Sequence, residues 1–515
     1  MEKKRLVINL FTNIISYSTI VMIAFFLTPY LIKTVGKDAY SFYPLINNIV
    51  SYMSIITVAL NSMAIRFITI ELVRNNLRKA NSYFVSVLYS NIMLASLLLV
   101  IMLFIIMFLE ELLNIPDDLI LSVKILFTLV FLSMLINIIG SVFETAVYAK
   151  NRMDLRSLIE IIQGIQRVTL YIILFTFFRS SIVYIGVVTI SLSTVYFISH
   201  FIFTKRLLPE LSLSFRYFDR KAINEILPSG IWNSVNQLGV LLLSNLSLLI
   251  CNILFSPEIA GEYSIVLLIP TCISGIISML SSVFMPIITQ KYAEGNTNLV
   301  VQVVQNSQRI IGLVTNILVV VIMVVGEEFF LLWVPGEDAH KLHILSLMAI
   351  GHLIITGAAW PILNLNTVLN KVKIPSLYIV GSGVVNLGIM LYFINYLNLG
   401  IYSVPLSTLI VNLIWVGVFV PIYPCKYLVE KKTIFYPPIL KSLIGASINY
   451  FIASITKKTL PISNWIDLFF VCVISGVIGL FVNLVIIFKP AEIKNITKKI
   501  ILLFMDRAKS IWNRI

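Results

Sequence analysis

The stretch that decides the fold is Ile8–Ile32, INLFTNIISYSTIVMIAFFLTPYLI, which is followed after a short turn by Ser41–Ile65, SFYPLINNIVSYMSIITVALNSMAI. Each run holds 25 residues without Asp, Glu, Lys or Arg. A helix rises about 1.5 Å per residue and the bilayer core is about 30 Å thick, so each run can span a membrane. The turn Lys33–Tyr40, KTVGKDAY, joins the two runs into a helical hairpin.

The turn of this hairpin has an echo later in the chain. Asp38-Ala39-Tyr40-Ser41 resembles Gly261-Glu262-Tyr263-Ser264, which lies 223 positions downstream and again between two apolar runs. Duplicated halves are a common build for membrane transporters. We therefore predict two pseudo-symmetric six-helix lobes, residues 1–207 and 222–428, joined by a basic linker over 208–221 and followed by two further spans within 429–488.

Composition favours a membrane protein. The chain is 59% hydrophobic and 12% charged, with a mean hydropathy of +0.97. A soluble chain of 515 residues could not bury so much apolar surface, so we predict an all-α polytopic membrane protein with about 14 transmembrane helices. The expected spans are 8–32, 41–65, 82–109, 119–147, 158–178, 181–203, 224–253, 262–288, 309–333, 342–370, 375–397, 400–425, 437–456 and 465–488.

The basic residues predict the orientation. With the N-terminus in the cytoplasm, 30 of the 38 Lys and Arg residues fall on the cytoplasmic side and 7 outside. This is the bias of the positive-inside rule, so both termini are expected in the cytoplasm. Topology then accounts for the net charge of +14 without a nucleic-acid partner. An amphipathic helix on the inner leaflet is expected over 489–515, from the spacing of Ile496, Ile500, Leu503, Phe504 and Ile511.

Enzyme and metal chemistry find little support in the sequence. The chain holds no P-loop, GxSxG or HExxH motif. Its four cysteines lie in or beside apolar runs without a CxxC pair, so neither a metal site nor a disulfide is expected. A membrane glycan ligase or polymerase is the weaker alternative, and it would use the acidic groups of one outer loop, Glu110, Glu111, Asp117 and Asp118.

Arg167 is the deepest charged residue of the first half. It lies 11 residues beyond Arg156, or about 16 Å into the fifth span, and it shares one helix face with Glu160 and Gln163. Charged groups at membrane depth are costly and usually face a bundle interior or a water-filled cavity. Arg167 is therefore a candidate substrate-binding residue. The structural alternative is an ion pair with Glu144 or Glu160.

Three basic residues are predicted to line one cationic cavity: Arg66, Lys124 and Arg167. A guanidinium can hold phosphate oxygens through two parallel hydrogen bonds, so such a cavity suits an anionic substrate. The expected polar lining includes Glu144, Glu160 and Gln163. The alternative for Arg66, Glu144 and Lys124, which lie near the ends of their spans, is that each side chain reaches toward the membrane surface.

The second half is polar but almost uncharged within its spans. Amides offer both donors and acceptors and suit sugar hydroxyls, whereas hydrogen bonding between helices is the structural alternative. The amides predicted to line the cavity are Asn233, Asn236, Gln237 and Asn364. His352 could exchange a coupling proton, because histidine titrates near neutral pH, and a satisfied core histidine is its alternative.

Several motifs carry a family resemblance. They are Phe26–Gly36 (FLTPYLIKTVG) with Tyr40, Asn61–Phe67 (NSMAIRF), Ala260–Ser264 (AGEYS), Phe330–Gly336 (FLLWVPG), and Leu369–Ser376 (LNKVKIPS) followed by Asn386-Leu387. On these residues the chain resembles the polysaccharide (O-antigen type) flippases of the multidrug/oligosaccharidyl-lipid/polysaccharide (MOP) exporter superfamily. Arg66 is the one charged residue among the predicted site residues that stands inside a matched motif.

The resemblance implies a function. Such a flippase transfers an undecaprenyl-diphosphate-linked oligosaccharide from the inner to the outer leaflet of the bacterial plasma membrane by alternating access. It implies no cofactor or metal beyond coupling to H⁺ or Na⁺. Its expected partners are the lipid-linked substrate, membrane lipids, and the polysaccharide polymerase and glycosyltransferases of the same pathway.

Two relatives within the superfamily are less favoured. Lipid II flippases carry arginine in the first span, and Ile8–Ile32 has none. Multidrug exporters commonly place acidic residues inside the membrane, whereas the deep charge here is mainly basic. An ion-coupled exporter of small molecules stays as the alternative function.

Overall fold

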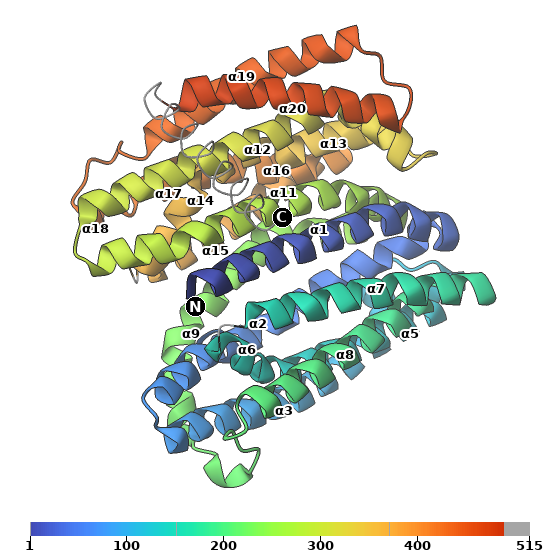
Figure 1. The fold of residues 1–515 in the computed structure, drawn as a ribbon. Helices are drawn as coiled ribbons and strands as arrows, with labels where there is room; N and C mark the ends of the chain where they lie inside the picture. Colours follow the sequence, from blue (N-terminus) through green and yellow to red (C-terminus); the bar gives the residue numbers. More distant parts are fainter. Residues whose placement is uncertain (1, 151, 370, 489–515) are drawn as a thin grey trace, which may run out of the picture. The chain divides into compact units, whose positions relative to one another are not determined.

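The computed structural model describes residues 2–150, 152–369 and 371–488, and every regular element in that part of the chain is a helix (Figure 1). Thirteen helices among the described residues are long and apolar enough to cross a membrane. A fourteenth span arises if α9 and α10, which are bent by 42°, count as one. The predicted class and the approximate number of spans are confirmed. The predicted amphipathic tail over 489–515 lies outside the described residues.

The described residues group into two compact units, Met1–Ile265 with Val372–Val404, and Val266–Lys371 with the remainder. The grouping follows spatial contact and not sequence repetition, so the six-helix lobes stay a prediction. The first unit contains α1 (Glu2–Val35), α2 (Lys37–Val73), α3 (Leu77–Met107), α4 (Leu109–Leu112), η1 (Asp117–Leu119), α5 (Ile120–Gly140), η2 (Ser141–Glu144), α6 (Thr145–Ala149), α7 (Met153–Phe177), α8 (Val183–Leu207), η3 (Phe215–Tyr217), α9 (Arg220–Ser244), α10 (Leu246–Leu254), α15 (Lys373–Asn395) and η4 (Gly400–Tyr402).

Helix α11 (Pro257–Ala293) begins in the first unit and continues into the second. The second unit then contains α12 (Thr297–Trp333), α13 (Ala339–Gly351), α14 (Leu353–Val368), α16 (Ser403–Ile414), the π-helical η5 (Trp415–Phe419), α17 (Val420–Ile422), α18 (Cys425–Leu428), α19 (Tyr436–Thr459) and α20 (Trp465–Ile487). Within this unit α12 packs against α13, α14, α19 and α20.

Polar capping residues set several helix starts. Asn76 begins α3 by accepting a hydrogen bond from the backbone N–H of Lys79, and Asp219 begins α9 by accepting one from Lys221. An N-cap side chain satisfies a backbone donor that the first turn of a helix leaves free. Gly36, with φ of 89°, makes the sharp turn between α1 and α2 that the hairpin of the sequence requires.

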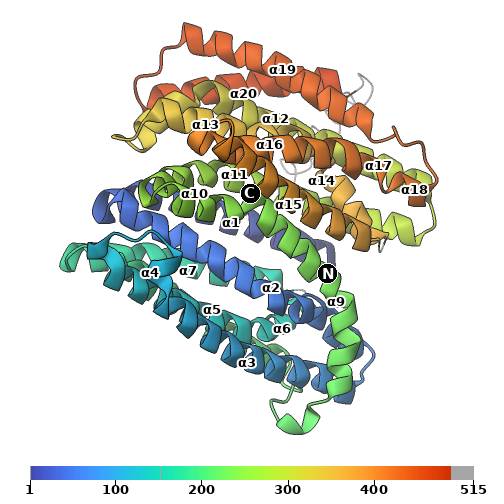
Figure 2. The ribbon, with the colours of Figure 1, turned by 180° about the vertical axis from the view of Figure 1, so that it is seen from behind.

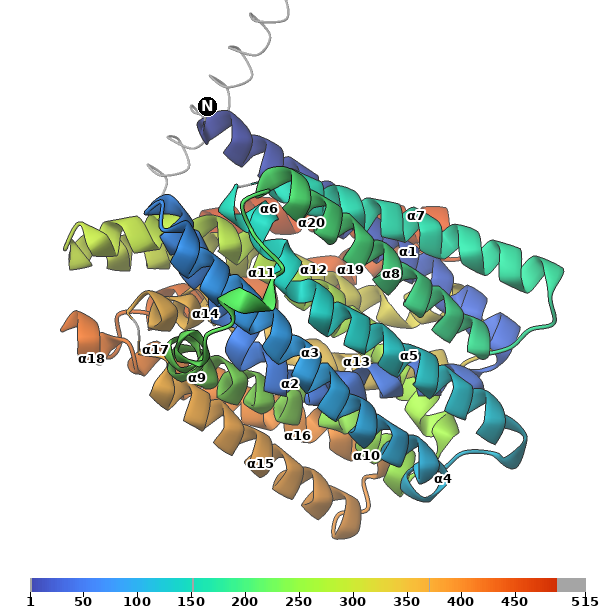
Figure 3. The same ribbon diagram turned by 90° about the horizontal axis from the view of Figure 1, so that it is seen from below.

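Neighbouring helices of the first unit run both parallel and antiparallel. Helix α5 packs antiparallel to α3 (Figure 2) and parallel to α8, and α1 packs parallel to α7 (Figure 1). One apolar core joins α2, α3, α6, α8 and the start of α9, with Phe84 and Phe143 in edge-to-face contact at 5.7 Å. Helix α9 packs against both α2 and α15 (Figure 3). It therefore sits between two long helices of the same unit.

The contact between α2 and α9 is close at the backbone. A Cβ atom on Gly230 of α9 would lie 1.7 Å from the carbonyl oxygen of Ala59 on α2, so this position has no room for any side chain. Three hydrogen bonds extend the contact along both helices, from Asn48 to the Asn245 carbonyl (3.2 Å), from Tyr52 to the Leu241 carbonyl (3.2 Å), and from Ser234 to the Ile55 carbonyl (2.8 Å). Small residues and polar contacts of this kind hold helices together in a bilayer.

The Gly230→Ala substitution is expected to destabilise the protein by about 1–3 kcal/mol, because α2 and α9 must separate to admit the methyl group. Thermal unfolding of the purified protein in detergent measures the loss. The matched control is Gly381→Ala in α15, where a Cβ meets nothing within 4 Å and helix propensity improves. Equal stability of the Gly230→Ala variant and the wild type would contradict the close approach.

Candidate functional site

The two ends of the first unit differ in charge. The "basic end" holds the α2–α3 turn, the α6–α7 turn and the segment before α9, with Arg74, Lys79, Arg152, Arg216 and Arg220. The "acidic end" holds the α1–α2 turn, the loop between α3 and α5 and the start of α11, with Glu110, Glu111, Asp117, Asp118 and Glu258. This contrast matches the distribution from which the sequence predicts orientation.

Lys37 ties two turns together at the acidic end. Its Nζ lies 3.2 Å from Glu258 and 3.5 Å from Glu262, both near the start of α11. Glu262 belongs to the later of the two stretches whose similarity predicts a duplicated chain, and Lys37 directly precedes the earlier one, so the two turns are in contact. Gly261 admits the lysine, because a Cβ there would lie 2.9 Å from Lys37 Cγ.

Lys124, predicted as part of the cationic cavity, also lies at the acidic end. Its Nζ is 3.3 Å from Glu110. A pocket of about 330 Å³ lies beside this pair and is lined by Glu110, Leu113, Asn114, Ile115, Pro116 and Pro257. Of the four acidic residues on which the enzyme alternative rests, Glu110 is the one in this lining, and it already has a cationic partner.

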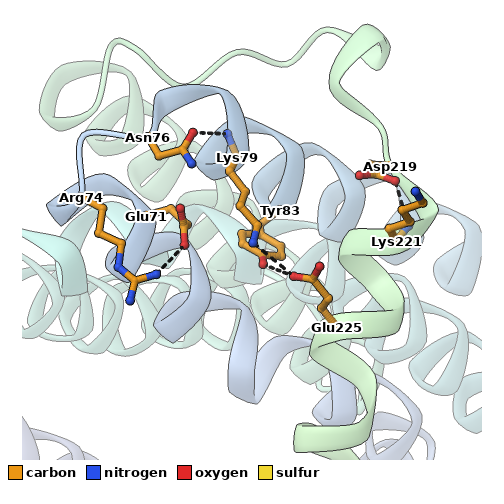
Figure 4. A network of polar contacts seen from close by, with 8 residues as sticks. All are labelled: Glu71, Arg74, Asn76, Lys79, Tyr83, Asp219, Lys221 and Glu225. Carbon is orange, nitrogen blue, oxygen red and sulfur yellow. Dashed lines mark hydrogen bonds and ion pairs between the residues drawn. The ribbon is translucent and has the colours of Figure 1, made fainter.

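At the basic end, side chains of α3 hold α9 (Figure 4). Tyr83 donates a hydrogen bond to Glu225, and Lys79 Nζ lies 3.5 Å from the same carboxylate. Nearby, Arg74 pairs with the buried Glu71 at 3.3 Å. The beginning of α9 is thereby fixed to α3 through one shared carboxylate.

The predicted basic linker, 208–221, is bound to α3 along its length. Asn81 donates to the Glu210 carbonyl at 3.1 Å and accepts from the Ser212 N–H. Ser86 exchanges two hydrogen bonds with the backbone of Asp219, at 2.8 and 3.0 Å. The linker is therefore an ordered strap on α3, a property that its basic composition does not reveal.

Arg66 lies exposed on α2, in the part of that helix which packs against the beginning of α9. Asn233, a predicted lining residue, donates to Ser62 at 3.1 Å, and Ser62 stands one helical turn before Arg66 on the same face. Asn236 is exposed and Gln237 half-buried, and both share the face of Asn233 on α9. We call this set, Ser62, Arg66, Asn233, Asn236 and Gln237, the "α2–α9 polar face". The set holds one guanidinium and three amides within one unit. Because α2 and α9 run antiparallel, Asn236 and Gln237 lie farther from Arg66 along the helix pair than Asn233 does. Arg66 has no carboxylate partner among the described residues.

Arg167 lies half-buried near the middle of α7, within electrostatic reach of Tyr171. Tyr40 and Tyr43 of α2 also lie within electrostatic reach of Tyr171. The alternative in which Arg167 pairs with Glu144 or Glu160 is wrong, because both carboxylates are bound by other side chains. In the described part of the chain Arg167 has Tyr171 within electrostatic reach and forms no ion pair with a carboxylate.

Glu144 and Glu160 belong to a separate set of ionisable groups nearer the basic end. Tyr196 donates to Glu144 at 2.5 Å, while Arg156 donates to Glu160 at 3.2 Å. Arg156 also donates to Tyr148. We call these residues, with His200, the "α6–α8 ionisable cluster". Gln163, the third predicted lining residue here, instead donates to the Leu192 carbonyl of α8 at 2.8 Å.

The remaining predicted residues lie in the second unit. Asn364 donates to Ser281 at 2.8 Å, which joins α14 to α11. His352 stands at the break between α13 and α14, where its carbonyl accepts from the N–H groups of Ile355 and Thr356. Asn364 therefore makes the interhelical bond of the structural alternative, and the coupling role of His352 stays a prediction.

Several residues of these sites were not identified from the sequence. Tyr43 and Tyr171 look like ordinary apolar-span tyrosines, and His200 looks like a lone histidine within an apolar run. A signal does exist for the cluster, since Arg156 and Glu160, and Tyr196 and His200, are each spaced four residues apart and so share a helix face. The contact between these two helices is tertiary, and no local pattern encodes it.

The fold and the charged and amide groups within its spans define a polytopic helical membrane protein of the transporter class. Residues 6–291, more than half of the chain, match the family described as polysaccharide biosynthesis protein. The chain belongs to this family. It is 25% identical over 458 residues to the uncharacterized membrane protein EpsK of Bacillus subtilis (strain 168), covering 89% of this chain and 90% of EpsK.

Solved structures show the same fold. An inward-facing multidrug resistance MATE family transporter of the MOP superfamily superposes with a TM-score of 0.66 at 13% identity, over 78% of this chain and 96% of that one. An outward-facing MATE family structure gives 0.59 at 13% identity, over 86% and 95%. Family and fold together identify a membrane transporter of the MOP superfamily, and they favour a transporter over an enzyme.

The Arg156→Gln substitution is expected to lower the thermal unfolding temperature, because Glu160 would lose its cation and Tyr148 its donor. The side chains of Arg156 and Glu160 are 40% and 31% exposed, so solvent weakens their ion pair. The expected loss in free energy of unfolding is about 1 kcal/mol. Arg78→Gln, on an exposed position at the basic end, is the matched control. A variant as stable as this control would show that the ion pair contributes nothing to folding.

Proposed function

We propose that this protein is a flippase for a polysaccharide precursor, moving an undecaprenyl-diphosphate-linked oligosaccharide across the bacterial plasma membrane by alternating access. Membership of the polysaccharide biosynthesis family supports the cargo class. The single structural observation that carries the proposal is the presence of two arginines, Arg66 and Arg167, without a carboxylate partner among the described residues. Such groups remain available to an anionic substrate.

The α2–α9 polar face supplies the complementary chemistry. A diphosphate would pair with the guanidinium of Arg66, and the sugar hydroxyls would hydrogen bond to Asn236 and Gln237, which are not buried. Arg167, with Tyr171 within electrostatic reach, would offer a second place for the phosphates. The prenyl chain would remain in lipid, since transfer of its many methylene groups into a polar site is unfavourable.

The orientation belongs to the same proposal. The basic end of the first unit would face the cytoplasm, as would both termini, because positively charged turns are retained on that side. The acidic end, with Glu110 and Glu258, would then face the outside. In this orientation Arg66 stands seven residues from the end of α2, about 10 Å, and so near the side from which the cargo enters.

Arg66→Ala and Arg167→Ala are expected to lower cargo translocation at least tenfold each, because a charge-assisted hydrogen bond contributes about 1.5–3 kcal/mol. Translocation of the undecaprenyl-diphosphate-linked oligosaccharide into proteoliposomes is the measurement. Arg78→Ala, an exposed arginine at the same end as Arg66, is the control and should retain activity. Lysine replacements should recover part of the rate, since lysine keeps the charge and loses the bidentate geometry.

Translocation at the wild-type rate in both alanine variants would remove the proposed phosphate sites. Failure of the wild-type protein to move the lipid-linked cargo, together with raised resistance of an overexpressing strain to cationic dyes, would instead support the exporter alternative. Ligation or polymerisation of the glycan that is lost on neutralising Glu110, Glu111, Asp117 and Asp118 would support an enzyme.

A further inference from the structure

The α6–α8 ionisable cluster contains a buried histidine, His200, with one ring nitrogen that receives no hydrogen bond from the described residues. His200 of α8 is 1% exposed. Its Nδ1 lies 3.0 Å from the backbone carbonyl of Tyr196. A carbonyl oxygen accepts and never donates, so Nδ1 carries the hydrogen. The Nε2 atom of the neutral ring then carries a lone pair and can accept a hydrogen bond, but it has no partner among the described residues. Buried polar atoms are rarely left in this way, because an unmet hydrogen bond is costly.

The charges around this base leave room for one more cation. Within electrostatic reach of His200 lie two carboxylates, Glu144 and Glu160, and one guanidinium, Arg156. Their sum is −1, and protonation of His200 would bring it to zero. Charge within a span is stable where it is balanced inside the protein, so the neutral, proton-bound state of the cluster has an electrostatic advantage.

Each helix that packs against α8 near His200 is accounted for in this sum. η2 contributes Glu144, α6 contributes Tyr148, and α7 contributes Arg156 and Glu160. Tyr196, on α8 itself, donates its hydroxyl to Glu144. Helix α5 has a single charged residue, Lys124, which pairs with Glu110 at the acidic end, the opposite end of the unit.

The cluster is open on one side and linked to a further helix. The side chains of Arg156 and Glu160 are 40% and 31% exposed, whereas His200 is buried. Glu160 also accepts a hydrogen bond of 2.5 Å from Ser16 of α1. A change of charge at Glu160 would therefore act on the contact between α1 and α7, while a change at His200 or Glu144 would act within α8 and η2.

We propose that Glu144, Arg156, Glu160 and His200 form a proton-binding site that takes up one proton from water on His200 Nε2, where the two carboxylates stabilise the imidazolium. The uptake forms one N–H bond and raises the charge of the cluster from −1 to 0. The site lies in the first unit, apart from His352, the histidine for which the sequence predicts a coupling role. Its use as the coupling site of transport rests on the proposed flippase function, whereas proton binding itself does not.

The site can be tested without any cargo. The full-length protein in lipid nanodiscs, with its four histidines labelled with ¹⁵N, is titrated by NMR, and His200→Gln identifies the His200 signal. Glu144→Gln and Glu160→Gln should each move the His200 midpoint to lower pH by about one unit, because each removes an anion that stabilises the imidazolium. Arg156→Gln should move it to higher pH, because it removes a cation.

Glu110→Gln is the matched control, a carboxylate-to-amide change in the same unit but at the acidic end, and it should leave the midpoint unchanged. The two carboxylate variants are independent, so loss of folding in one leaves the other as a test. The proposal is overturned if the titration midpoint of His200 is the same in Glu144→Gln, Glu160→Gln and the wild type. It is also overturned if the His200 ring does not titrate between about pH 5 and 8.

Exchange of K⁺ for Na⁺ at constant ionic strength separates a proton site from a sodium site. The expected His200 midpoint is the same in both salts. A sodium-specific shift that Glu144→Gln and Glu160→Gln abolish would assign the cluster to Na⁺ and overturn the proposal. Because no lipid-linked sugar enters this experiment, its result stands apart from the translocation measurement: proton binding without translocation rejects the flippase, and translocation without proton binding rejects this site.

Discussion

A polar side chain within a bilayer has to find its hydrogen-bond or ionic partner inside the protein, and this constraint governs the whole structure. The contact of α2 with α9 shows it most clearly. Asn48, Tyr52 and Ser234 each bond to a backbone carbonyl of the opposite helix, and Gly230 allows the two backbones to approach. The same rule explains the ion pair of Lys124, which lies within a span, with Glu110.

Because most polar groups within the spans need a partner, the groups without one are candidates for function. Arg66 and Arg167 have no carboxylate among the described residues, and His200 Nε2 has no donor. The two arginines offer positive charge to a substrate, while the histidine stands in a cluster that is one positive charge short. In the described part of the chain the arginines lack an anionic partner, whereas the histidine nitrogen lacks a hydrogen-bond donor, and these residues lie on different helices of the first unit. Our two proposals, a phosphate-bearing cargo and a proton-binding cluster, follow from this difference.

Much of the fold was predictable because each span is encoded locally. A run such as Ser41–Ile65 is apolar over the thickness of a bilayer whatever its neighbours are, and the structure has a helix there, Lys37–Val73. The site was less predictable. Depth along a helix singles out Arg167 but gives no partner, and the structure shows no ion pair of Arg167 with Glu144 or Glu160, the alternative that the sequence left open. Gln163, Asn233 and Asn364 were predicted to line a cavity; each donates a hydrogen bond to another helix, and the lining role stays a prediction.

The amino-acid sequence by itself determined the class, the number and approximate bounds of the spans, and the family, because hydropathy and short motifs are properties of contiguous residues. Tertiary structure decided which polar groups are satisfied. Glu160 meets Ser16 across 144 residues and Tyr83 meets Glu225 across 142, and no local spacing predicts such contacts. Whether a charge in a membrane is a structural bond or a free group depends on these distant partners, and the packing of helices alone supplies them.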